Sequence, residues 1–103
     1  MKTKTQTLAP IHPGEVLRED FMKPLGLTAT AVARAIGSSP IAISQIIRGQ
    51  RSVSAEMALK LGRYFGVSPE LWSGLQADYD LEVARAKTGR AIERSIMLCP
   101  ALA

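Results

Sequence analysis

The sequence contains one cysteine and one histidine among its 103 residues, and this scarcity excludes several classes of protein. Cys99 alone cannot form a disulfide or a CxxC redox or metal pair within the chain. Together with His12 it offers too few ligands for a zinc ion. One histidine leaves no evident Ser-His-Asp set, and neither a GxGxxG nor a GxxxxGK phosphate loop occurs. We therefore predict a protein with no catalytic residues, no metal and no cofactor.

Long apolar runs are also missing from the sequence. No segment approaches the roughly 20 apolar residues that span a bilayer, and the N-terminus lacks the apolar core of a signal peptide. Because a single cysteine suits a reducing compartment, we expect a cytoplasmic protein with no membrane partner. A chain of this length that is 47% hydrophobic has room for one compact domain.

Acidic residues are scarce in the middle of the chain. Residues 28–66 carry five Lys or Arg residues and one Glu, a surplus equal to the +4 net charge of the whole sequence. Residues 67–82 show the opposite bias, with four acidic residues and no Lys or Arg. We expect the first segment to face an anion such as DNA. The second segment would be repelled by DNA but not by a basic partner protein.

Residues 27–51, LTATAVARAIGSSPIAISQIIRGQR, predict two short helices joined by a turn. Thr28 suits the N-cap of the first helix, and Ser39 with Pro40 gives the second an N-cap followed by proline at its first position. Gly37 can adopt the positive φ that often ends a helix. So short a connection favours a helix-turn-helix over an antiparallel hairpin. The alternative is an ordinary amphipathic helix pair in a small bundle.

The second of these helices has an apolar inner face. Ile43, Ile46 and Ile47 fall at i, i+3 and i+4, so we expect them to pack inward. The remaining side chains are small or hydrogen-bonding and can enter the major groove of DNA. The residues expected to face outward are Ile41, Ala42, Ser44, Gln45 and Arg48.

Specific roles follow for several of these side chains. The Gln45 amide can pair with N6 and N7 of adenine, whereas Arg48 and Arg51, at and past the helix end, would meet phosphate more readily. Thr28 and Thr30 open the preceding helix, whose free N–H groups can bind phosphate. The alternatives are a solvated glutamine, surface charge and plain N-capping. The predicted DNA-binding residues are Thr28, Thr30, Arg34, Ser39, Ile41, Ala42, Ser44, Gln45, Arg48 and Arg51.

Helical spacing continues on both sides of this motif. One helix is expected over residues 13–23, followed by Leu25 and Leu27 in the core. Others are expected over residues 55–65 and from residue 69 onward. With the two helices of the motif these make five, and no segment predicts a strand. The fold class is therefore all-α.

The chain divides into three parts. We expect a flexible N-terminal arm at residues 1–11, a helix-turn-helix domain at residues 12–82 and a C-terminal extension at residues 83–103. Gly89 interrupts the helical pattern of the extension. The sequence leaves open whether the extension is a short sixth helix, a loose segment or a strand added to a partner.

The helix that starts at residue 69 has apolar residues that could serve two purposes. A fifth helix on a four-helix core can expose part of its apolar side. Trp72, Leu75 and Tyr79 are therefore candidates for the dimer interface, and the alternative is that they belong to the core.

Three segments carry a family resemblance: IHPGEVLREDF in the first helix, the helix-turn-helix, and SAEMALKLGRYFGVSPELWSGLQADYDL at residues 54–81. Together they resemble the HigA antitoxin branch of the lambda-repressor-like (Xre) helix-turn-helix superfamily. The resemblance covers residues 11–82 and is most specific in the last segment.

This resemblance implies a five-helix lambda-repressor-like domain that forms a homodimer. It also implies repression of the protein's own operon at a palindromic operator in double-stranded DNA, and neutralisation of a RelE-like ribonuclease toxin. Family members often begin the recognition helix with Arg, Lys or Gln, where this chain has Pro40, Ile41 and Ala42. We therefore expect readout to shift to Ser44, Gln45, thymine-methyl contacts and DNA shape. The alternatives are a stand-alone helix-turn-helix regulator without a toxin partner and a bundle that binds only protein.

Overall fold

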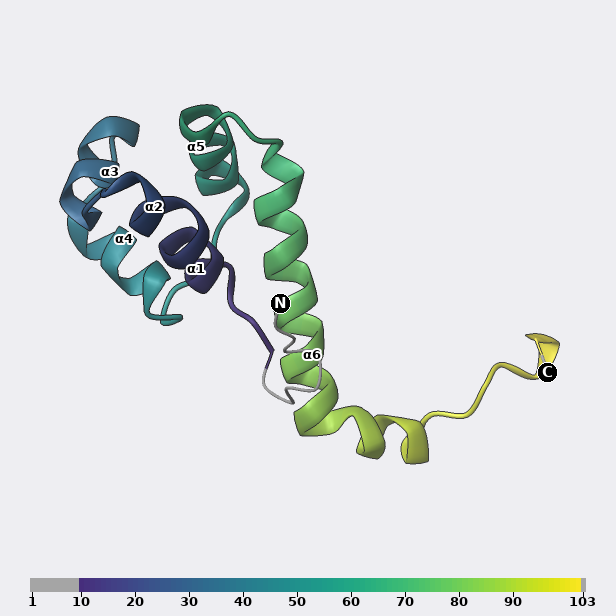
Figure 1. The fold of residues 1–103 in the computed structure, drawn as a ribbon. Helices are drawn as coiled ribbons and strands as arrows, with labels where there is room; N and C mark the ends of the chain where they lie inside the picture. The colour runs from purple at the N-terminus through teal and green to yellow at the C-terminus, as the bar shows by residue number, and fades with distance from the viewer. Residues whose placement is uncertain (1–9, 103) are drawn as a thin grey trace.

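The computed structural model describes residues 10–102, where it contains helices and no strand. Residues 1–9, most of the predicted arm, lie outside the described part. Because α1, η2 and α2 are consecutive, the described residues form five main helices, which are arranged as in Figure 1, and the all-α prediction is confirmed. The elements are α1 (Pro13–Val16), η2 (Leu17–Met22), α2 (Lys23–Leu25), α3 (Ala29–Ile36), α4 (Pro40–Ile47), α5 (Ala55–Phe65), α6 (Pro69–Ser95) and η3 (Pro100–Leu102).

The first helix changes its hydrogen-bond register in the middle. In the π-helical segment η2, the Lys23 N–H donates to the Arg18 carbonyl, five residues back. Pro24 comes next and has no N–H to donate, so the regular ladder is already altered where the proline enters. The helix can therefore continue through Pro24 instead of ending before it.

The end of this helix differs from the sequence prediction. It closes at Gly26, whose φ of 66° is left-handed, and so runs two residues further than expected. Leu25 stays on the last helical turn and is 63% exposed, so its predicted place in the core is wrong. Leu27 packs against the core, as predicted.

The predicted helix boundaries around the turn from α3 to α4 are confirmed. The Thr28 hydroxyl oxygen accepts from the Ala31 N–H at 3.0 Å and so caps α3. The Ser39 hydroxyl oxygen accepts from the Ala42 N–H at 3.0 Å and caps α4. Between them Gly37 has a φ of 70°, so α3 ends and α4 begins within three residues.

Trp72 lies in the centre of the core. Its side chain has no exposed surface, and the Phe21 ring of the first helix lies 5.1 Å away between centroids. Trp72 therefore belongs to the core. Its predicted place in a dimer interface is wrong, because a side chain with no exposed surface cannot contact a partner. Leu75 packs against the core and Tyr79 is half-buried, so each keeps only part of its surface for a partner.

Helix α6 is longer than the sequence predicted. It runs without a break from Pro69 to Ser95 and passes through Gly89, so the predicted interruption there is wrong. A glycine costs a helix only about 1 kcal/mol relative to alanine, and the nearby residues Lys87, Arg90 and Ala91 are good helix formers. The expected boundary between residues 82 and 83 falls inside α6. Its second half and the residues after it extend away from the other helices (Figure 1).

His12 joins the first helix to α6. Its Nδ1 accepts from the Gly14 N–H at 2.9 Å and so caps α1. Its ring meets Tyr79 edge to face, with the centroids 4.8 Å apart. Burial lowers the pKa of His12 below its ordinary value, although the charge of Asp80 and a hydrogen bond with the Arg51 backbone act in the opposite direction.

We expect acidification to destabilise the fold through His12. Only the neutral ring can accept the Gly14 N–H, so the unfolded chain takes up a proton at a higher pH than the folded protein does. This contribution to the free energy of unfolding is full above the ordinary pKa of 6.5 and is lost as the pH falls through the lower folded pKa.

Urea unfolding of the wild type and of His12→Asn between about pH 7.5 and about pH 5 measures this effect. Asparagine caps helices but does not titrate in this range, so it serves as the matched control. The wild type should lose stability relative to the variant on acidification. A difference between the two proteins that does not change with pH contradicts the role of His12.

Candidate nucleic-acid interface

The outer face of α4 presents most of the side chains expected there. Ile41 is 68% exposed, Arg48 is exposed, and Ser44 and Gln45 are half-buried. Ala42 is only 7% exposed, so its predicted place on the outward face is wrong. The reason is helical geometry: a residue four positions before Ile46 shares that residue's inward direction.

A shallow hollow lies between the N-terminal turn of α3 and the outer face of α4. It brings together several residues that the sequence predicted for DNA binding, although they come from two helices. The lining residues are Ala29, Thr30, Pro40, Ile41, Ser44, Gln45, Arg48 and Gln50. The other predicted residues that are exposed are Thr28, Arg34, Ser39 and Arg51.

Gln50 is a polar side chain of this hollow that the sequence reasoning missed. It follows Gly49, whose φ of 74° turns the chain at the end of α4. The Gln50 N–H then donates to the Gln45 carbonyl at 2.8 Å, which holds Gln50 close to the helix end. The signal was present in the string RGQR, where a glycine after the helix returns the next residues toward its outer face.

The two arginines predicted to contact phosphate are paired with the polar side chains of α4. Arg48 Nη2 donates to Ser44 Oγ at 3.1 Å, and Arg51 Nε donates to Gln45 Oε1 at 2.9 Å. An amide oxygen has two lone pairs, so Gln45 can accept from Arg51 and from adenine N6 together. Its Nε2 can then donate to adenine N7. The arginine thus orients the amide without consuming it.

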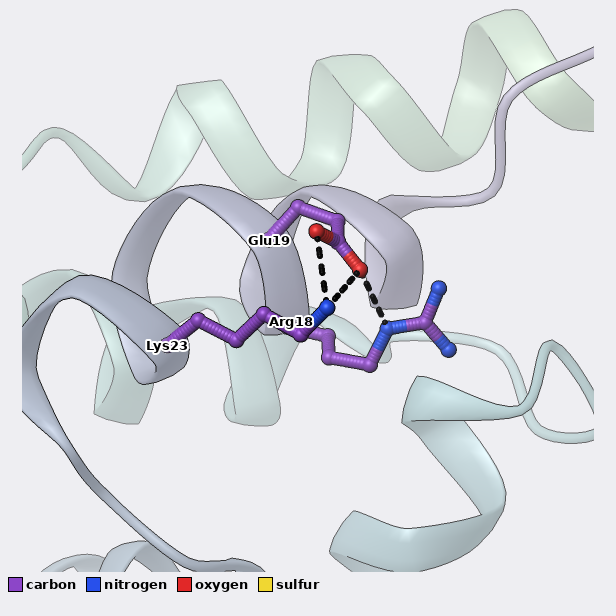
Figure 2. Close-up of polar contacts among 3 residues, drawn as sticks. All are labelled: Arg18, Glu19 and Lys23. Atoms are coloured by element: carbon purple, nitrogen blue, oxygen red, sulfur yellow. Dashed lines mark hydrogen bonds and ion pairs between the residues drawn. The ribbon is translucent and has the colours of Figure 1, made fainter.

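A charged cluster on the first helix lies beside this interface. Figure 2 shows Glu19 between Arg18 and Lys23; its carboxylate accepts from Arg18 Nε at 2.8 Å and from Lys23 Nζ at 3.2 Å. Hydrogen bonds from Lys23 and from Arg18 lower the pKa of Glu19 below its ordinary value. Arg18 also lines a second shallow hollow next to Arg48 and Gln50. The Glu19 carboxylate is therefore paired with two basic side chains, while Glu15 lines the same second hollow as Arg18.

The described residues form neither a metal site nor a membrane-spanning helix. Across residues 10–102, no three His, Cys, Asp or Glu side chains gather as a metal site would require. Cys99 is exposed and unpaired there. None of the helices in this part of the chain combines the length and apolar character needed to cross a bilayer.

Helices α3 and α4 meet at a tight glycine turn, and α4 carries amide and guanidinium side chains on its outer face. This arrangement defines a helix-turn-helix domain. A family model described as helix-turn-helix matches residues 19–72. The chain is also 50% identical over 74 residues to virulence-associated protein I of Dichelobacter nodosus, a match that covers 72% of this chain and 68% of that protein.

Solved structures narrow the classification. The Pseudomonas aeruginosa antitoxin HigA, solved with the higBA promoter, aligns with a TM-score of 0.84 and 44% identity over 85% of this chain and 96% of its own. Antitoxin GraA in complex with its operator aligns with a TM-score of 0.84 and 39% identity over 96% of this chain and 97% of its own. The chain belongs to the HigA-type antitoxins of the helix-turn-helix family.

Proposed function

We propose that this protein is an antitoxin that binds operator DNA as a homodimer, represses its own operon and neutralises a RelE-like ribonuclease toxin. The observation that carries the DNA-binding part is the hollow between α3 and α4, which brings the Thr30 hydroxyl of α3 together with hydroxyl, amide and guanidinium groups of α4 and the residues that follow it. HigA and GraA, two relatives of similar structure, were solved with promoter and operator DNA respectively. Their DNA complexes support the same role for this chain.

The side chains divide into two groups by what they can reach. Arg48 and Arg51 lie at the end of α4 and just past it, where guanidinium groups bind phosphate. Gln45 is the proposed base reader, and the exposed Ile41 can contact a thymine methyl group. Thr28 and Ser39 already serve as caps, but each hydroxyl can still donate its proton to a phosphate.

Substitutions at Gln45 and Arg48 separate base reading from positioning on the backbone. Gln45→Ala should weaken binding to the operator by about 1 to 3 kcal/mol per half-site and leave random DNA nearly unaffected. Arg48→Ala should weaken both, because phosphates are the same in every sequence. Fluorescence anisotropy with the protein's own upstream DNA and with a scrambled duplex measures both effects. Equal losses on the two duplexes for Gln45→Ala would make Gln45 a positioning residue.

We assign the dimer interface to α6. Among its exposed apolar residues are Leu71, Leu81 and Ile92. Its first half, through residue 82, is acidic and its second half, residues 83–95, is basic. An antiparallel pair of α6 helices from two copies would therefore set each acidic half against a basic half. Trp72 no longer belongs to this proposed interface, and Leu75 and Tyr79 contribute only their exposed edges.

The toxin is proposed from membership of the antitoxin family. If the protein is an antitoxin, the neighbouring reading frame should encode a small basic protein that copurifies with it after coexpression. Growth arrest by that neighbour alone, relieved by this protein, is the expected result. A neighbouring frame that neither arrests growth nor copurifies would favour a stand-alone helix-turn-helix regulator.

A further inference from the structure

The loop that carries Gln50 and Arg51 is held in place by α6. This loop, residues 49–53, connects α4 to α5 and ends at Val53, which is 5% exposed. Gln76 of α6 is 7% exposed, and its Oε1 accepts from the Val53 N–H at 2.8 Å. A side chain 23 residues further along the chain thus fixes the end of the loop.

Both polar atoms of the Gln76 side chain are used. While Oε1 accepts from Val53, Nε2 donates to Asp80 Oδ1 at 2.9 Å, one turn further along α6. The Asp80 carboxylate therefore holds the amide in the orientation that presents oxygen to the loop. A flipped amide would place its NH₂ group against the Val53 N–H, which would leave that buried donor unpaired.

The same loop also contacts the recognition helix, α4. Two residues before Val53, Arg51 Nε donates to Gln45 Oε1 at 2.9 Å. At the start of the loop, the Gly49 N–H donates to the Ile46 carbonyl at 2.9 Å, which ties the loop to the end of α4. The loop is therefore fastened at both ends, and its middle orients the amide of Gln45.

We propose that Gln76 is a positioning residue for DNA recognition. With Asp80 it fixes the loop so that Arg51 holds the Gln45 amide in the orientation that reads a base. This role rests on the proposed DNA-binding function. It adds to that function a residue of α6, outside the helix-turn-helix, that sets how well operator and random DNA are told apart.

The first test removes both hydrogen bonds and keeps the size of the side chain. Gln76→Leu leaves the Val53 N–H without its partner, so the loop can shift and Arg51 can release Gln45. We expect the ratio of operator to random-DNA affinity, measured where the variant is folded, to fall about tenfold. A lost packing contact alone would lower the unfolding temperature without changing this ratio.

The second test exchanges the polarity of the pair. Gln76→Glu keeps an acceptor for Val53 but places a second carboxylate beside Asp80, so we expect poor discrimination. Adding Asp80→Asn restores a donor and acceptor pair one turn apart, with the same net charge as the wild type. The double variant should recover most of the wild-type ratio. Hydrogen exchange of the Val53 N–H should slow in parallel with that recovery.

Each outcome bears on a different claim. If the wild type does not prefer its own upstream DNA to scrambled DNA, the proposed function fails and this role fails with it. If the wild type discriminates and folded Gln76→Leu discriminates equally well, only the role of Gln76 is overturned. If Gln76→Leu does not fold, a double variant that discriminates no better than Gln76→Glu alone overturns it.

Discussion

Replacing Gly14 by alanine is expected to lower the free energy of unfolding by about 3 kcal/mol or more and to abolish DNA binding. A Cβ atom at Gly14 would lie 1.7 Å from the Ile46 carbonyl oxygen and 2.9 Å from the Ile47 Cα. Both atoms belong to the backbone of α4, which no change of side-chain rotamer can move. The recognition helix must therefore separate from α1, and the loop that carries Arg51 moves with it.

Gly74 provides the matched control for this substitution. It lies on α6, is exposed, and has no neighbouring atom within 4 Å of the position that a Cβ would take. Gly74→Ala should raise the free energy of unfolding by about 0.5 to 1 kcal/mol, because glycine is unfavourable inside a helix. Urea unfolding should therefore show a lower free energy of unfolding than the wild type for Gly14→Ala and a higher one for Gly74→Ala. A Gly14→Ala protein as stable as the wild type would contradict the close contact between α1 and α4.

Substituting Leu81 by glutamate should convert the proposed dimer to a monomer and weaken operator binding by about a hundredfold or more, because two linked recognition helices bind far better than one. Leu81 is 55% exposed on α6, so a charge there costs the single chain little. Leu75 and Tyr79 make poorer targets. Leu75 packs on the core and Tyr79 on His12, and changes there would disturb the fold as well as a dimer.

Leu59 supplies the control for this test, since it is 61% exposed but lies on α5. Leu59→Glu should remain a dimer and keep its affinity for operator DNA. Light scattering gives the mass of each variant, and circular dichroism checks that helicity is retained. If folded Leu81→Glu is still a dimer, the interface lies elsewhere, such as in the first helix or the residues after α6.

Features that depend on local chemistry were predictable from the sequence. Thr28 and Ser39 cap their helices by bonding an N–H three residues ahead, and Gly37 ends α3 because it adopts a positive φ. Neighbouring residues alone determine these contacts, so the helix boundaries of the motif could be predicted from its local sequence. The inward face at Ile43 and Ile46 followed in the same way from helical spacing.

Features that depend on other parts of the chain were not predictable. Trp72 belongs to the core because Phe21 of the first helix covers it, and no pattern within α6 reveals that contact. The hydrogen bond from the Val53 backbone N–H to Gln76 joins residues far apart in sequence, so no local pattern indicated that Gln76 supports the interface. Ala42 was a different kind of error, since its position relative to Ile46 already placed it inward.

The measurement that tests DNA recognition most directly is a salt titration of binding to the protein's own upstream DNA, with a scrambled duplex as the reference. A dimer that contacts about six to ten phosphates should lose on the order of a thousandfold or more in affinity between about 50 and 200 mM salt. Its preference for the upstream sequence should remain at each salt concentration. A nearly flat salt response, or equal affinity for the two duplexes, would contradict an operator-binding interface on α3 and α4.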